Sequence, residues 1–178
     1  MINSLNLSLN DKISALYLCA DILDYPDDNY YENIKLLENL INHKFTLQEV
    51  LLEDVCSEYI RIFSIDATKS KCVPYASWWI DGKMSGKTLL KIVDFYKSCG
   101  YEFDADSLKK PADNISSMIS FAAILAEDKK HKELKDFTKY LNWLDDFAKS
   151  LEKTSDAKTY KNVVEITIKI LNSLKGEL

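Results

Sequence analysis

The chain has 178 residues, of which 47% are hydrophobic, and its formal net charge of −5 leaves no basic surface of the kind that nucleic acids require. Its four glycines and three prolines are too few for the turns of a many-stranded sandwich or barrel. We therefore expect an all-α fold, a single compact bundle of about six or seven helices spanning residues 1–178.

The first expected helix carries apolar residues at helical spacing from Ile13 to Leu23. Ser8, followed three residues later by Asp11, has the arrangement of a capping box that begins a helix. The stripe ends just before Pro26, because proline disfavours helical geometry in the residue that precedes it.

Two further stripes follow before the pattern is lost. The second covers residues 34–41, and the third opens at Thr46, with Glu49 as a second capping box, and continues through residues 50–63 for about five turns. Residues 64–84 then break the helical spacing, so we expect a long loop there.

Helical spacing returns in the second half of the chain, where apolar residues again recur on one face. Gly100 follows the first of these stripes, at the position of a left-handed helix cap. The expected helices cover residues 85–96, 115–125, 134–151 and, after Ser155, 160–174.

The long loop contains an aromatic cluster that includes Tyr75, Trp78 and Trp79. Two adjacent tryptophans cannot both point into the core, so we expect one of them at the surface. Large exposed rings are common at the centre of peptide-binding surfaces. We take Trp79 as the contact residue, while the alternative is that one ring packs under the loop and the other on the core's rim.

The segment Gly82 to Thr88 ends in the Gly-Lys-Thr of a phosphate-binding loop, but its spacing is wrong. Three residues separate its glycines where the nucleotide motif needs four, and Asp81 replaces the first glycine. A carboxylate there would repel a phosphate. We interpret the segment as a turn and a helix start at Ser85.

No arrangement of side chains indicates catalysis, a metal or a bound cofactor. The cysteines are scattered singly, and the two histidines lie far from all of them, which does not fit a zinc site or a nucleophilic dyad. Residues 1–8 lack the features of a secretory signal, and no apolar stretch is long enough to span a membrane. We therefore expect a cytoplasmic protein that is not inserted in a membrane and has cysteines of structural type: Cys19, Cys56, Cys72 and Cys99.

Several segments, in order, resemble those of the TorD/DmsD/NarJ family. Glu58-Tyr59-Ile60-Arg61-Ile62-Phe63 is similar to that family's Glu-Tyr-x-Arg-Leu-Phe, and the likeness extends over most of residues 12–175. The other segments that carry it are Cys72–Asp81, Leu89–Tyr96 with Gly100, Lys110–Ile115, Phe121–Glu127 and Leu141–Leu144.

The resemblance implies a chaperone, not an enzyme, that binds the catalytic subunit of a molybdopterin-dependent oxidoreductase until its cofactor is inserted. Many members of the family also bind the twin-arginine signal peptide of that client. The family's binding region corresponds to the Pro74–Asp81 loop and to Asp113 with its neighbours, where a carboxylate could hold a guanidinium beside aromatic rings. The implied client-binding residues are Pro74, Tyr75, Ser77, Trp78, Trp79, Asp81, Lys110, Pro111, Asp113 and Asn114.

The sequence departs from the family at this region, where the frequent Glu-Pro-x-Asp-His becomes Lys110-Pro111-Ala112-Asp113-Asn114. A base replaces an acid, and Asn114 cannot carry the charge of a histidine. Asp113 also has a structural interpretation, as the cap of the helix that follows Pro111.

Two other functions stay open at this point. One is a nucleotide- or cofactor-binding regulator that uses the helix start at Ser85, and the other is an interaction scaffold with no role in maturation. Helical proteins of this kind also exchange elements between protomers, so a monomer and a swapped dimer are both compatible with the sequence.

Overall fold

The computed structural model describes residues 7–45, 50–63, 72–154 and 157–177. Within these ranges the chain forms ten α-helices and one short 3-10 helix. The expected all-α fold is confirmed, but the helices outnumber the six or seven that periodicity predicts. They are α1 (Leu9–Ile22), α2 (Tyr30–Ile41), α3 (Leu52–Phe63), α4 (Ala76–Asp81), α5 (Lys87–Ser98), α6 (Ala105–Leu108), α7 (Ile115–Glu127), α8 (His131–Phe137), η1 (Thr138–Leu141), α9 (Leu144–Glu152) and α10 (Lys158–Glu177).

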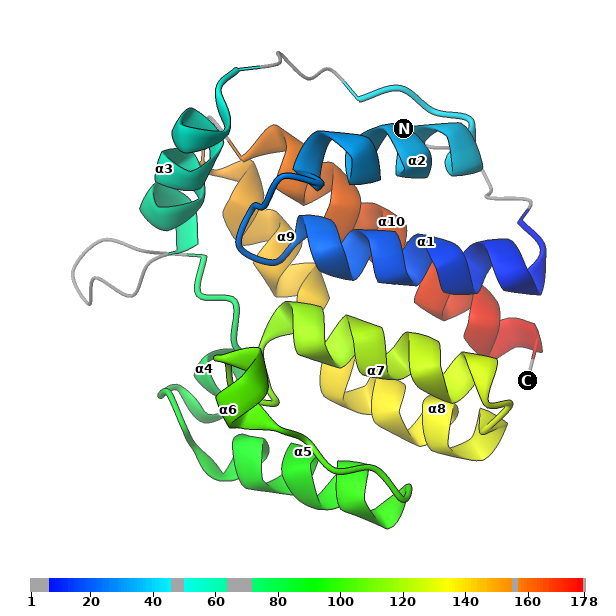
Figure 1. The fold of residues 1–178 in the computed structure, drawn as a ribbon. Coiled ribbons are helices and arrows are strands. Elements are labelled where there is room, and N and C mark those ends of the chain that lie inside the picture. Colours follow the sequence, from blue (N-terminus) through cyan, green and yellow to red (C-terminus); the bar gives the residue numbers. More distant parts are fainter. Residues whose placement is uncertain (1–6, 46–49, 64–71, 155–156, 178) are drawn as a thin grey trace.

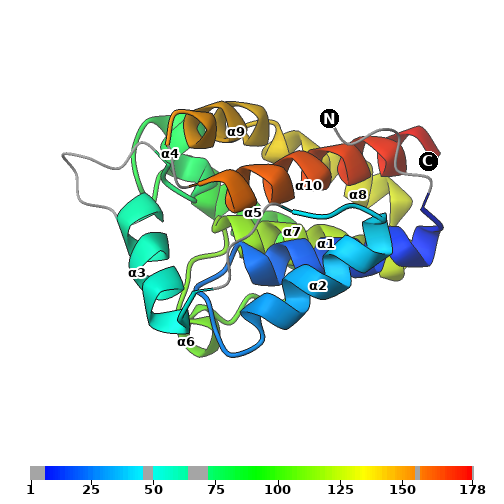
Figure 2. The same ribbon diagram turned by 90° about the horizontal axis from the view of Figure 1, so that it is seen from above.

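The bundle is organised around α7 and α1, which pack side by side (Figure 1). α8 packs on α7, α2 packs on α1, and α10 lies between α1 and α9, as the view from above shows (Figure 2). Met118, Ile119 and Ala122 of α7 have no exposed surface. The buried apolar side chains of the described residues form one connected core, and no helix among those residues is both long and apolar enough to cross a bilayer.

The start of α1 confirms Ser8 as the N-cap, which is one half of the expected capping box. Ser8 Oγ accepts a hydrogen bond of 3.2 Å from the backbone N–H of Asp11, and its hydroxyl donates to Asp11 Oδ2 at 2.7 Å. The second expected capping box, at Thr46 and Glu49, lies outside the described residues. α3 has 12 residues, about three turns at 3.6 residues per turn and shorter than the five that we expected.

α3 lies at one end of the bundle, in both views, and aromatic rings attach it to the core (Figures 1 and 2). The Phe63 ring lies 4.9 Å from Tyr160 and 6.1 Å from Phe147, and Tyr59 lies 6.0 Å from Tyr160. These ring contacts hold the face of α3 that carries Tyr59 against the core.

The prediction of one long loop over residues 64–84 is wrong for its second half, because residues 76–81 form α4. Residues 64–71 lie outside the described part of the chain. α4 begins after Tyr75, whose side chain makes no capping hydrogen bond. Asp113 caps the helix instead, because its Oδ2 accepts a hydrogen bond of 3.0 Å from the Ser77 N–H. A cap that comes from 36 residues away gives no local signal in the sequence.

The predicted helix start at Ser85 is also wrong. Ser85 has a positive φ of 52°, and α5 begins at Lys87. The capping side chain is Asp81, whose carboxylate accepts from the backbone N–H of Thr88 at 2.7 Å and from Thr88 Oγ1 at 2.9 Å. The backbone N–H of Thr88 is therefore already bonded to a carboxylate of the chain itself. This N–H lies at the helix start that the nucleotide-binding alternative would use.

The single helix expected over residues 134–151 is divided into α8, η1 and α9. The Thr138 hydroxyl donates to the backbone carbonyl of Lys135 at 2.9 Å, where the backbone tightens into the 3-10 turn. Phe137, Leu141 and Leu144 still face the core. Because their spacing in the sequence is that of a continuous helix, it does not reveal the break between α8 and α9.

Candidate functional site

Residues 74–77 and 113–115 lie side by side, joining α4 to the start of α7. The Ala76 N–H donates to the Asp113 carbonyl and the Ile115 N–H to the Pro74 carbonyl, both at 2.9 Å. Tyr75 and Asn114 form an isolated antiparallel bridge. Five of the residues implied by the resemblance, Pro74, Tyr75, Ser77, Asp113 and Asn114, are thus brought together.

Asp113 is only 1% exposed, and its carboxylate binds the first turn of α4 through the Ser77 N–H. The expectation that Asp113 caps the next helix is wrong: that cap is Asn114, whose Oδ1 accepts from the Ser116 N–H at 2.9 Å. Asp113 therefore fixes the geometry of α4, and negative charge at a helix N-terminus is favourable.

The two tryptophans of α4 have different environments. Trp78 is 38% exposed, whereas the Trp79 indole N–H donates to the Val73 carbonyl at 2.7 Å. The Trp79 ring stacks on Trp143, with centroids 6.2 Å apart and planes at 16°, and meets the edge of Phe147. Trp78, and not Trp79 as we expected, is the tryptophan that this helix presents to solvent.

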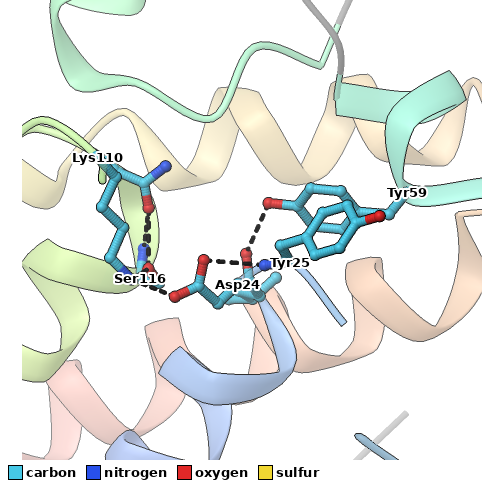
Figure 3. Close-up of polar contacts among 7 residues, drawn as sticks. Asp24, Tyr25, Tyr59, Lys110 and Ser116 are labelled. Atoms are coloured by element: carbon cyan, nitrogen blue, oxygen red, sulfur yellow. Dashed lines mark hydrogen bonds and ion pairs between the residues drawn. The ribbon is translucent and has the colours of Figure 1, made fainter. Parts of the chain in front are cut away.

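Lys110 forms a polar cluster with residues that the sequence analysis did not single out (Figure 3). Its ammonium pairs with the carboxylate of Asp24, from the turn after α1, and donates to Ser116 Oγ at 2.7 Å. The Asp24 side chain is still 39% exposed, against 18% for Lys110. The second oxygen of Asp24, Oδ1, accepts the Tyr25 N–H at 2.8 Å.

Two tyrosines lie on the other side of Asp24 from Lys110 (Figure 3). Tyr25, which is 54% exposed, meets Tyr59 of α3 edge to face, with ring centroids 5.6 Å apart. The Tyr59 hydroxyl donates to the Leu23 carbonyl at 3.4 Å, and burial raises the Tyr59 pKa well above its usual value. We call Asp24, Tyr25, Tyr59 and Lys110 the Asp24 cluster.

The surroundings of the Asp24 cluster are acidic. The pKa of Asp21 is raised, first by burial and then by repulsion from Asp24 and Asp27, while Lys110 partly offsets these effects. Three carboxylates and one ammonium thus lie at the C-terminal end of α1, where the helix dipole is also negative. This end of the bundle favours a cationic ligand.

Two more of the implied residues are Asp81, which lies apart from the Asp24 cluster, and Pro111, which follows Lys110 in the chain. Asp81, at the far end of α4, is used to cap α5, and the hydrogen bond from the Thr88 N–H lowers its pKa. Pro111 is half-buried between Lys110 and Ala112. No pattern in the sequence marks Asp24, Tyr25 or Tyr59 as site residues, although the turn Tyr25-Pro26-Asp27-Asp28 indicates that the chain is exposed there.

The comparisons with known proteins agree with this architecture. A family model described as the nitrate reductase delta subunit matches residues 26–154. A protein of Haemophilus influenzae described as a Tat proofreading chaperone, DmsD, is 26% identical over 166 residues, which cover 89% of this chain and 81% of that protein. A crystal structure from Archaeoglobus fulgidus, described as a redox enzyme maturation protein, has a TM-score of 0.69 and 28% identity, covering 90% of this chain and 93% of that one.

The family match runs from the turn that contains Pro26 to the end of α9 and so includes the Tyr75–Asn114 pairing, Lys110 and Tyr59. Each of these alignments covers most of the relative's own length as well as most of this chain. The chain belongs to the nitrate reductase delta subunit family, the TorD/NarJ family that its sequence segments resemble.

Proposed function

We propose that this protein is a cytoplasmic chaperone that binds a molybdopterin-dependent oxidoreductase subunit, and the client's twin-arginine signal peptide where there is one, during cofactor insertion. Family membership supports this proposal, as do relatives described as a Tat proofreading chaperone and a redox enzyme maturation protein. The chaperone binds and releases its client, and it carries out no reaction of its own.

The observation that carries the proposal is the environment of Asp24. Its carboxylate is 39% exposed, stands next to the exposed ring of Tyr25, and lies in an acidic region. A carboxylate has about four lone-pair positions, so Asp24 can keep Lys110 and the Tyr25 N–H and still accept a guanidinium. An arginine held there would lie against the Tyr25 ring, where a cation–π contact adds to the ion pair.

We assign different roles to the two aspartates. Asp24 contacts the client, whereas Asp113 positions α4, the helix that holds Trp78 at the surface. This helix follows Tyr75, whose pKa is raised first by burial and also by Asp24. A buried carboxylate already bonded to a backbone N–H has little left to offer a client. Trp78, at 38% exposed, supplies apolar area for the residues that follow the arginine.

The test is a calorimetric titration of the chain with a synthetic twin-arginine peptide. Asp24→Asn removes the charge but keeps the shape, and we expect the peptide to bind about 10- to 100-fold more weakly, because a charge-assisted hydrogen bond contributes roughly 1.5–3 kcal/mol. Raising the salt concentration should weaken binding to the unchanged protein more than to the variant.

Asp28→Asn is the matched control, because Asp28 is an exposed acid in the same turn that does not contribute to the raised pKa of Asp21. This control should bind the peptide as the unchanged protein does. If both variants lost the same peptide affinity, Asp24 would act only through the net charge of the protein. If Asp24→Asn bound the peptide as tightly as the unchanged protein, the client would bind elsewhere on the surface.

A further inference from the structure

A cavity of about 270 Å³ lies between α7 and the segment that leads from α5 through α6 to Lys110. Four of the residues that line it are aromatic: Tyr96, Tyr101, Phe103 and Phe121. It is separate from the pairing of residues 74–77 with 113–115. A cavity of about 150 Å³ is enough to hold benzene, so this one has room for a phenyl or indole ring.

The aromatic wall is fixed before any ligand arrives. Tyr96 and Phe121 have ring centroids 3.9 Å apart, and Tyr101 meets Phe121 edge to face at 5.4 Å and 86°. The Tyr96 hydroxyl donates to the Ala112 carbonyl at 3.2 Å, and the Tyr101 hydroxyl bonds to Asp128. Rings held in this way lose little freedom when another ring packs against them, which favours binding.

Ser117 gives the same cavity an unused polar group. It lines the cavity from α7 and is 7% exposed, and its hydroxyl has no hydrogen-bond partner among the described residues. Buried polar side chains are normally paired, so an unpaired one in the wall of a cavity calls for an explanation. The hydroxyl oxygen is enclosed by the protein, so the Ser117 side chain would rotate about its Cα–Cβ bond to meet a hydrogen-bonding group on the ring of a ligand.

Lys110 connects the cavity to the Asp24 cluster. Its side chain is part of the cavity lining, while its ammonium is held by Asp24 and Ser116. A single peptide can therefore place a cation at Asp24 and a neighbouring side chain in the cavity, with Lys110 between them.

We propose that the cavity receives an aromatic side chain of the client peptide whose arginine is bound at Asp24. This inference rests on the function proposed above and adds a determinant of specificity to it. Fixed aromatic rings bind another ring through offset and edge-to-face contacts, and the Ser117 hydroxyl favours a ring with an N–H or O–H, such as that of tryptophan or tyrosine.

Two synthetic peptides test the proposal: a twin-arginine peptide with a tryptophan in its apolar segment, and the same peptide with alanine in that position. On the unchanged protein we expect the tryptophan peptide to bind about tenfold more tightly, which is the order of the free energy of burying a large ring. Ser120→Trp fills the cavity from its half-buried rim, and it should abolish the difference between the two peptides.

Ser14→Trp makes the same substitution at an exposed position of α1 that does not line the cavity, and it should preserve the difference. If Ser120→Trp loses helicity, Ser120→Phe adds a smaller ring at the same position and takes its place. Equal affinities of the two peptides for the unchanged protein, or a difference that survives in the filled variant, would overturn the proposal.

The two proposals fail in distinguishable ways. If Asp24→Asn weakens the binding of both peptides but the tryptophan gives no advantage, only the cavity is misassigned. If neither peptide depends on Asp24, the proposed client site is wrong, whatever the cavity binds.

Discussion

Trp78 and Trp79 are neighbours in the chain, but the bundle uses them in opposite ways. Trp79 is held by a hydrogen bond to Val73 and by contact with Trp143 and Phe147, while Trp78 keeps 38% of its surface exposed. The first side chain therefore contributes to folding, and the second is available for a client.

Alanine at each position separates these roles. Trp79→Ala should lower the free energy of unfolding by about 2–4 kcal/mol, because a packed ring and its hydrogen bond are lost. Trp78→Ala should change stability by less than about 1 kcal/mol and weaken binding of the twin-arginine peptide by more than about 1 kcal/mol. Urea unfolding and calorimetry measure the two effects, and a stable Trp79→Ala that binds poorly would reverse the assignment.

The connection between α4 and α5 depends on Gly86. A Cβ atom at Gly86 would lie 2.2 Å from Asp81 Oδ2, the oxygen that accepts the Thr88 N–H. Even alanine must therefore displace the carboxylate that caps α5. The lowered pKa of Asp81, caused first by that N–H, reports the same contact.

Gly86→Ala should lower the Tm by about 2–4 °C, as expected for the loss of a helix cap in a chain of this size. The Asp81 pKa should rise towards its ordinary value. A lowered folded-state pKa stabilises the fold at neutral pH, and this contribution disappears as pH falls through that pKa, so the variant should lose less stability on acidification. Gly176→Ala, in α10 with open space around its Cβ position, is the control and should not lower the Tm. Equal Tm values for both variants would contradict this account of the connection.

Across the bundle, helical spacing predicts the helices that bury a continuous apolar stripe. α1, α2 and α7 lie close to the predicted ranges because local apolar residues determine both their helicity and their packing. α4 was missed because its cap comes from Asp113, and the break between α8 and α9 because the apolar spacing continues through the 3-10 turn.

For the site, too, the sequence predicts features that depend on neighbouring residues and does not predict contacts between distant ones. The sequence brought attention to residues 74–81 and 110–114, and the structure joins residues 74–77 to residues 113 and 114 around the Tyr75–Asn114 bridge. Lys110 and Asp24 are 86 residues apart, so no local pattern reveals their pairing. Burial, which decides that Asp24 rather than Asp113 can meet a client, is a property of the packed bundle.

We expect the exposed ring of Tyr25, in the Asp24 cluster, to contact a molybdopterin-dependent oxidoreductase. A photo-crosslinking amino acid placed at Tyr25 in the full chain, inside its native cells, tests this claim directly, because mass spectrometry identifies whatever protein is captured. We expect the molybdoenzyme subunit to be crosslinked at Tyr25 and not at Leu36, a residue of α2 with similar exposure of 48%. Equal capture at both positions, or capture at Tyr25 of proteins unrelated to molybdoenzymes, would contradict the account.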